Sequence, residues 1–189
     1  MDINKLEDKL DDFDKEVRLQ TLGLLKKNIK RGEGSGYVNL HAHTFFSFNA
    51  YGYSPSHIAW RGYKEGLDVV GIVDFDVLDG VDEILEAGRI LGLKTVAGME
   101  TRVFFEEYNN KVINSPQEEG VYYLISIGFY KEPKPNEENG LEKLKKTARD
   151  RNLARLKKIN ELLPEIKIDY EKDVLPLTPL GNATERHIL

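Results

Sequence analysis

Apolar and polar residues change their spacing along the chain, and each change predicts a different element. Over residues 2–30, apolar side chains recur every three or four positions among dense charges, which is typical of an amphipathic helix or a pair of helices. Beyond residue 36, short apolar runs alternate with helical patterns. This alternation predicts short parallel strands joined by right-handed helical crossovers. We expect strands over 37–41, 68–74, 95–103 and 121–130, and helices over 55–66 and 81–91.

The two helices between these strands carry local start and stop signals. Ser54 followed by Pro55 is typical of an N-cap and a first helical position. Gly66 and Gly92 should end the helices, because glycine adopts the left-handed conformation at little cost. His57 lies early in the first helix, and we expect it at the surface.

A longer helix is predicted from residue 141 to about 163. Its leucines, isoleucine and alanine recur at helical spacing, and basic residues fall between them. These could meet a phosphate polymer, but Glu142 and Asp150 interrupt the positive charge, so a solvated face is the simpler interpretation. The basic residues of this face are Lys145, Lys146, Arg149, Arg151, Arg155, Lys157 and Lys158.

Composition narrows the classes of function. The 27 basic and 32 acidic residues give a net charge of -5, which argues against nucleic acid as a partner on a broad surface and leaves a small basic pocket open. Cysteine is absent from the sequence, so a metal site would use histidine, aspartate, glutamate and water. No apolar run approaches the roughly 18 residues of a membrane span, and residues 1–5 are too polar for a signal peptide. We therefore expect a cytoplasmic protein without a membrane partner, while its oligomeric state stays open.

Residues that bind metals stand where three of the predicted strands end. His41 and His43 follow the first apolar run, and alternate strand residues point to the same side, so both could bind one ion. Asp74 and Glu100 end two further apolar runs, each after a helical stretch. Because the ends of successive parallel strands meet at one edge of a sheet, this pattern predicts an active site.

The same motifs resemble those of the PHP (polymerase and histidinol phosphatase) family of metal-dependent phosphoesterases. The resemblance covers residues 37–130. Residues 39–47, Asn-Leu-His-Ala-His-Thr-Phe-Phe-Ser, are similar to the family's His-x-His-Thr motif and its nearby serine. Residues 73–76, Val-Asp-Phe-Asp, with Gly80 beyond, are similar to its Thr-Asp-His-Asp motif. Residues 98–100, Gly-Met-Glu, are similar to its Gly-x-Glu motif, and the order of the three motifs implies the family's fold.

The resemblance implies that His41 and His43 bind one metal ion and that Glu100 bridges it to a second. It also implies that Asp74 orients a ligand or the attacking water. Such ligands suit zinc, manganese or iron. Arg102 or Arg186 could hold the remaining charge of a bound phosphate by bidentate contact.

The chain departs from the family pattern at three positions. Phe75 stands where the family has a histidine, and phenylalanine cannot coordinate a metal. Asn49 stands where many members carry another ligand, and Tyr123 where the family tends to have a histidine. The family's later motifs are also missing, so the sequence cannot assemble a complete three-ion cluster. A partial site remains, which Asp74, water or His187 could complete.

The fold predicted from these observations is α/β, with a mostly parallel sheet in a partial or distorted (β/α) barrel of PHP type. The chain is short for a closed barrel, which needs about 250 residues. We expect residues 1–34 to be a helical N-terminal extension and residues 35–189 to be a PHP-like domain, whose C-terminus could be truncated.

The function predicted first is a metal-dependent hydrolase of the phosphoesterase class, acting on a phosphorylated small molecule. A metal-bound water would be the nucleophile, with Asp74 as a candidate proton acceptor. The alternative is a non-catalytic PHP-like module with a degenerate metal site that binds a ligand or a partner chain. A third interpretation makes the N-terminal helix and the basic helix docking elements for another subunit.

Several side chains keep a purely structural alternative. Asp74 and Asp76 could cap the following loop, a role that leads for Asp76. His187 could complete the site or bind nothing. The aromatic residues after the His-x-His motif could pack the loop or form a wall of a substrate pocket; they are Phe45, Phe46, Phe48, Tyr51 and Tyr53.

Overall fold

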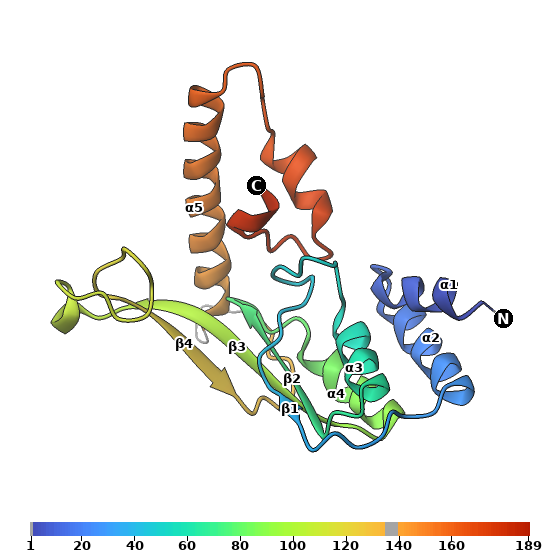
Figure 1. The fold of residues 1–189 in the computed structure, drawn as a ribbon. Helices are drawn as coiled ribbons and strands as arrows, with labels where there is room; N and C mark the ends of the chain where they lie inside the picture. Colours follow the sequence, from blue (N-terminus) through green and yellow to red (C-terminus); the bar gives the residue numbers. More distant parts are fainter. Residues whose placement is uncertain (1, 135–139) are drawn as a thin grey trace.

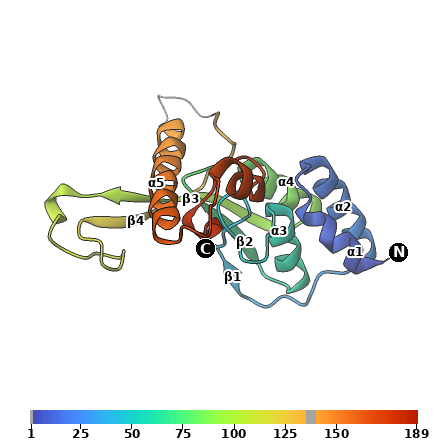
Figure 2. The ribbon, with the colours of Figure 1, turned by 90° about the horizontal axis from the view of Figure 1, so that it is seen from above.

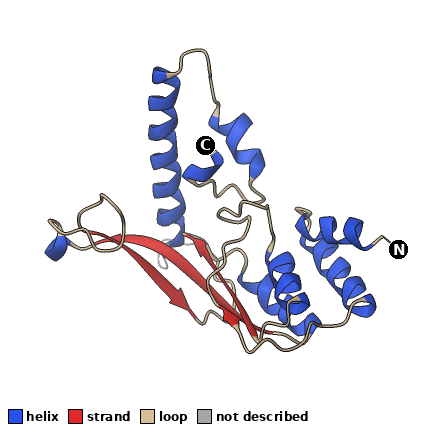
Figure 3. Ribbon diagram, viewed as in Figure 1, coloured by secondary structure: helices blue, strands red, loops and turns tan. Residues whose placement is uncertain are grey.

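A computed structural model describes residues 2–134 and 140–189 of the chain. The structure has one four-stranded sheet, and the helices lie on one side of it and above it (Figures 1 and 3). The strands, in their order across the sheet, are β1 (Val38–Asn39), β2 (Val69–Phe75), β3 (Lys94–Phe104) and β4 (Val121–Ile127). The helices are α1 (Ile3–Asp8), α2 (Lys15–Asn28), α3 (Pro55–Lys64), α4 (Val81–Leu91) and α5 (Leu141–Leu162). Among the described residues, no helix is both long and apolar enough to cross a membrane.

The sheet is mixed rather than purely parallel. β1 pairs with β2, and β2 with β3, in parallel, as expected for strands joined through α3 and α4. β4 runs antiparallel to β3 because residues 105–120 return the chain as a hairpin connection without a crossover helix. The four strands curl into an open half-barrel, which agrees with the partial barrel predicted from the sequence.

Local sequence signals place the helices where they were expected. The Ser54 hydroxyl oxygen accepts a hydrogen bond from the His57 backbone N–H at 3.0 Å, and Pro55 is the first residue of α3. α4 ends before Gly92, which has a φ of 69°. The first strand is shorter than predicted, because only Val38 and Asn39 pair with β2.

One apolar core fills the space between the sheet and helices α2 to α4. Leu22, Trp60 and Ile84 belong to it and are fully buried. The N-terminal helices, which the sequence presents as an extension, therefore pack into the same core as the sheet. Arg18 of α2 also crosses to α4, where its Nε donates a hydrogen bond to Glu83 Oε1 at 2.8 Å, with both side chains buried.

His57 is buried, so its assignment to the surface is wrong. Its Nδ1 lies 2.7 Å from Asp11 Oδ2, and its ring stacks on Tyr53 with centroids 3.8 Å apart. The segment before α2 covers the start of α3, a tertiary contact that helical spacing alone does not predict.

A second, smaller body consists of residues 148–189, here called the α5–tail body. It rises above one end of the sheet, whereas α1 to α4 gather at the other side (Figures 1 and 2). Inside it, Asn152 Nδ2 donates to the Ala183 carbonyl at 2.6 Å. Its own apolar cluster consists of Leu156, Tyr170, Val174 and Ala183.

Candidate metal centre

Three side chains predicted as metal ligands meet at one point beside the sheet. His41 Nε2 lies 3.0 Å from Glu100 Oε2, and His43 Nε2 lies 3.3 Å from the same oxygen. The three donor atoms all lie within 4.8 Å of one another. Two imidazoles and a carboxylate form a donor set that zinc, manganese and iron accept. The cluster therefore fits a divalent metal ion.

The register between β2 and β3 brings this carboxylate to the histidines. Glu100 lies opposite Phe75, the last residue of β2. The segment that follows β1 runs alongside β2, and Val73 N–H donates to the Ala42 carbonyl at 2.9 Å. The two histidines thus approach Glu100 from an irregular segment rather than from a regular strand.

His43 is more enclosed than His41. Its ring stacks on Phe75, with centroids 4.4 Å apart and an interplanar angle of 12°. Burial lowers the pKa of His43, and the neighbouring Glu100 carboxylate opposes this effect. Because a histidine ligand must be neutral, burial favours the form that binds a metal. Phe75 cannot be a ligand itself, but it packs against a candidate ligand.

Residues 41–53 form an irregular segment, here called the histidine loop. Asp74 is buried behind this loop. One carboxylate oxygen accepts hydrogen bonds from the Thr44 N–H and the Ser47 hydroxyl, and the other accepts from the Thr44 hydroxyl, each at 2.7 Å. Burial raises the pKa of Asp74, against the lowering effect of these three donors. Both oxygens therefore hold the loop that follows His43. This is a structural role, but the loop is not the one after β2 that the sequence predicted Asp74 to cap.

The residues that follow His43 stabilise the histidine loop, and among them is Asn49, one of the departures from the family pattern. Asn49 Nδ2 donates to the His43 carbonyl at 2.9 Å, and its Oδ1 accepts from the Tyr51 N–H at 2.9 Å. Phe45 and Phe46 are buried and pack against each other. Asn49, Phe45 and Phe46 thus pack beside the two candidate ligands and add no further candidate.

Tyr123 and His187 lie outside the donor cluster found among the described residues. Tyr123 lies beneath Arg102, whose guanidinium carbon is 5.8 Å from the ring centroid. His187 Nδ1 accepts a hydrogen bond from the Thr184 N–H at 3.0 Å, and its ring meets Phe48 edge-on. His187 therefore packs the C-terminal segment.

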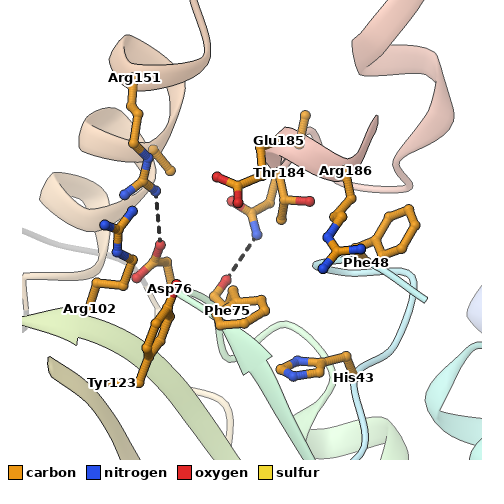
Figure 4. A pocket seen from close by; sticks show the side chains of 13 residues that line it. His43, Phe48, Phe75, Asp76, Arg102, Tyr123, Arg151, Thr184, Glu185 and Arg186 are labelled. Atoms are coloured by element: carbon orange, nitrogen blue, oxygen red, sulfur yellow. Dashed lines mark hydrogen bonds and ion pairs between the residues drawn. The ribbon is translucent and has the colours of Figure 1, made fainter. Parts of the chain in front are cut away.

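A cavity of about 320 Å³ opens beside His43 (Figure 4). Both arginines predicted to bind substrate line this cavity, Arg102 from β3 and Arg186 from the C-terminal segment. Arg102 also forms an ion pair with Glu118. Chain segments far apart in sequence thus contribute to a single cavity next to a candidate ligand.

Sequence reasoning assigned two further residues of this cavity to other roles. Arg151 of α5 points into it, although the helical pattern placed this residue on the solvated face (Figure 4). The sequence held one signal of this orientation. Arg151 comes three residues after Ala148, which is buried, and residues three apart lie on the same face of a helix. Asp76 also lines the cavity and has a φ of 61°, a backbone conformation that aspartate tolerates better than most residues.

Asn182 closes one side of the cavity, and no pattern in the sequence pointed to it. Its Nδ2 donates to the carbonyls of Phe46 and Phe75, each at 3.1 Å. This buried amide connects the C-terminal segment to the histidine loop and to the end of β2.

Curated relatives match only part of the chain. No profile of a known protein family matches it. An error-prone DNA polymerase of Corynebacterium efficiens is 35% identical over 78 residues, which are 40% of this chain and 7% of the polymerase. A 5'-3' exoribonuclease of Haemophilus influenzae is 29% identical over 68 residues, which are 36% of this chain and 24% of that protein.

Solved structures match more of the chain. A protein from Bifidobacterium adolescentis, assigned as a metal-dependent phosphoesterase, has a TM-score of 0.59 and 22% identity, covering 83% of this chain and 49% of that one. An amidohydrolase from Chromobacterium violaceum, with bound sulfate and no metal, has a TM-score of 0.56 and 18% identity, covering 80% and 47%. The chain thus spans about half the length of these proteins and a smaller part of the curated relatives.

These similarities define the fold. Together with the sequence matches, they confirm the resemblance to the PHP family. At these identities the solved structures show the fold, and the donor cluster shows where a metal ion could bind.

Proposed function

We propose that this chain is a metal-dependent hydrolase that cleaves a phosphoester. The observation that carries the proposal is the convergence of His41, His43 and Glu100, whose donor atoms lie within 4.8 Å of one another. The fold shared with a protein assigned as a metal-dependent phosphoesterase supports the choice of substrate class.

The protein's own residues would hold the ion and arrange the reaction. When bound, a divalent ion acts as a Lewis acid on phosphoryl oxygens and lowers the pKa of a coordinated water, to about 7 for zinc. His41, His43 and Glu100 supply the ligands, and Phe75 fixes the ring of His43. Asp74 holds Thr44 and the loop beside the cluster. Because its oxygens already accept three hydrogen bonds, we assign Asp74 a positioning role ahead of the proton-acceptor role.

The cavity favours a small substrate that carries phosphate. Its volume of about 320 Å³ lies at the lower end of ligand pockets. Arg102 and Arg186 supply positive charge that could bind phosphate oxygens. The sulfate bound by the Chromobacterium violaceum protein supports anion binding by this fold. The partial likeness to a DNA polymerase and an exoribonuclease makes oligonucleotides a second substrate class to test.

The metal ligands are tested with a double variant, His41→Ala with His43→Ala. We expect the purified protein to retain near-stoichiometric zinc, manganese or iron, measured by inductively coupled plasma mass spectrometry, and the double variant to retain none. Reloaded wild-type protein should hydrolyse phosphomonoesters or diesters such as 4-nitrophenyl phosphate and its bis ester, and the double variant should lose this activity by at least about a hundredfold.

His187→Gln is the matched control, since this histidine lies outside the donor cluster. It should retain metal as the wild type does. Persistence of the metal or of the activity in the double variant would show that the ligand assignment is wrong.

A second candidate is a non-catalytic module with a degenerate metal site. It is favoured by one observation, the filling of a family ligand position by Phe75, which stacks on His43. Under this proposal the cavity binds a ligand or a partner chain without turnover. Stoichiometric metal together with turnover, both lost in the histidine double variant, would exclude it.

A further inference from the structure

Two guanidinium groups from distant parts of the chain meet over the cavity. Arg102 extends from β3 and Arg151 from α5, and their side chains point toward the same region (Figure 4). Among the residues that the structure describes, the Nε atoms of both arginines are buried and have no hydrogen-bond partner. A buried donor without an acceptor is destabilising, so this arrangement is unfavourable unless an acceptor joins it.

The described carboxylates nearby do not meet this need: Glu185 lines the cavity but accepts from Arg155 Nη1 at 2.7 Å. Asp76 Oδ2 lies 3.8 Å from the nearest Arg151 nitrogen, which is beyond hydrogen-bond distance, and its Oδ1 accepts from the Thr101 hydroxyl at 2.6 Å. Glu118 pairs with the Nη2 of Arg102 and leaves its Nε free. Both arginines thus keep a donor to spare although acidic side chains lie beside them.

We propose that Arg102 and Arg151 form an oxyanion subsite that binds a phosphate or carboxylate group of the substrate. The planar guanidinium presents its donors in a fixed fork that matches both groups, and a tetrahedral phosphate has enough oxygens to accept from both arginines. Tyr123 supports the Arg102 guanidinium from below, at 5.8 Å. The role of Arg151 in catalysis rests on the proposed hydrolase function, but oxyanion binding does not.

Through Arg151, α5 would contribute to the choice of substrate. Of the donor cluster, His43 lines the same cavity of about 320 Å³ as both arginines, so a ligand in this cavity can lie next to His43 and to the subsite. Substrates without a matching anion should bind more weakly, because the two guanidinium groups would then stay unpaired.

The test measures binding of inorganic phosphate to metal-stripped protein by isothermal titration calorimetry. Wild-type protein should bind phosphate, and Arg151→Gln should weaken the binding at least about tenfold. Arg149→Gln is the matched control, because Arg149 lies on the same helix but pairs with Glu171 and does not line the cavity. It should bind phosphate within about twofold of the wild type.

A gain of binding keeps the test independent of damage to the fold. Asp76→Asn removes the carboxylate that competes for Arg151, and asparagine tolerates the backbone conformation at this position. Phosphate binding should therefore tighten severalfold. The proposal is overturned if the wild type binds no phosphate at 20 mM, or if Arg151→Gln binds it as the wild type does.

Acetate distinguishes the two sources of the anion. The phosphate titration is repeated in the presence of acetate. If acetate does not weaken phosphate binding, the subsite binds a phosphate group; if acetate displaces phosphate, the subsite also accepts a carboxylate. Because the protein is stripped of metal, loss of phosphate binding in Arg151→Gln is separable from failure of the metal centre. In the metal-loaded enzyme, Arg151→Gln should raise KM for an anionic substrate while leaving metal content unchanged.

Discussion

The apolar core around the sheet and the α5–tail body differ in size and in the kind of contacts that stabilise them. The core joins side chains from α2, α3, α4 and the sheet, and its members Trp60 and Ile84 are fully buried. The apolar cluster of the α5–tail body is small, and this body reaches the rest of the protein partly through polar contacts. Asn182 bonds to two backbone carbonyls of the core region, and Arg151 faces Asp76.

This difference separates two parts of the candidate site. The candidate ligand Glu100 lies on a central strand of the sheet, whereas Arg151 and Arg186 belong to the smaller body. A metal centre needs ligands fixed to within a fraction of an ångström, and a large apolar core supplies that rigidity. Substrate-binding residues tolerate a less firmly packed support, which also lets substrate enter and leave.

The largest expected effect tests the core through its buried ion pair. Arg18→Leu leaves the Glu83 carboxylate buried without its partner, and we expect the free energy of unfolding to fall by about 3–5 kcal/mol. Unfolding in urea can be followed through Trp60, the only tryptophan in the sequence.

Two further variants control this measurement. Glu83→Gln added to Arg18→Leu removes the stranded charge and should recover much of the loss, since the amide oxygen can still accept from Ser56. Arg89→Leu breaks an exposed pair with Glu86 on α4 and should cost less than about 1 kcal/mol. Equal effects of Arg18→Leu and Arg89→Leu would contradict the structural role of the buried pair.

A smaller and more local effect is expected in the α5–tail body. Leu156→Ala empties part of its apolar cluster and should destabilise that body by about 2–3 kcal/mol, at the lower end for buried leucines because the cluster is small. Hydrogen exchange should accelerate over residues 148–189, with β2 and β3 unaffected and metal affinity within about twofold of the wild type.

The comparison is sharpened by Leu153→Ala, an exposed position on the same helix that should change neither quantity. Exchange that accelerates equally in β2 and β3 after Leu156→Ala would mean that the two bodies unfold as one cooperative unit.

The smallest expected effect is a pH dependence at His187. Burial lowers the pKa of His187 below its usual value of 6.5, so the unfolded segment takes up a proton more readily than the folded one. The stability of the C-terminal segment should therefore fall as the pH drops below about 6.5 and be fully present above it. Thermal unfolding at pH 7.5 and 5.5 should show a larger decrease for the wild type than for His187→Gln, and an equal decrease would argue against this residue as the source.

Short-range signals predicted most of the elements. The ends of α3 and α4 follow from Ser54, Pro55 and Gly92, because capping and left-handed turns depend on a few neighbouring residues. The antiparallel direction of β4 was harder to predict, since an apolar run shows that a strand forms but not which way it pairs. The long connection over residues 105–120 was the main clue.

The residues of the candidate site also differ in how well the sequence predicted them. His41, His43 and Glu100 were predicted because their residue types and their order in three motifs restrict what they can do. Asp74 and Arg151 were harder to assign. Whether a carboxylate faces a ligand or a loop depends on the neighbours that donate to it, and here those donors are Thr44 and Ser47.

Local spacing and side-chain chemistry were enough to predict most helices and strands and the three residues that could hold a metal. Folding alone makes the N-terminal helices part of the core and brings Arg151 of α5 to the cavity beside Arg102. These contacts join surfaces that become adjacent only when the chain is folded, so no local pattern predicts them. A basic helix face in solvent and a basic helix face that lines a cavity have the same local sequence pattern. They differ only in whether another segment packs nearby.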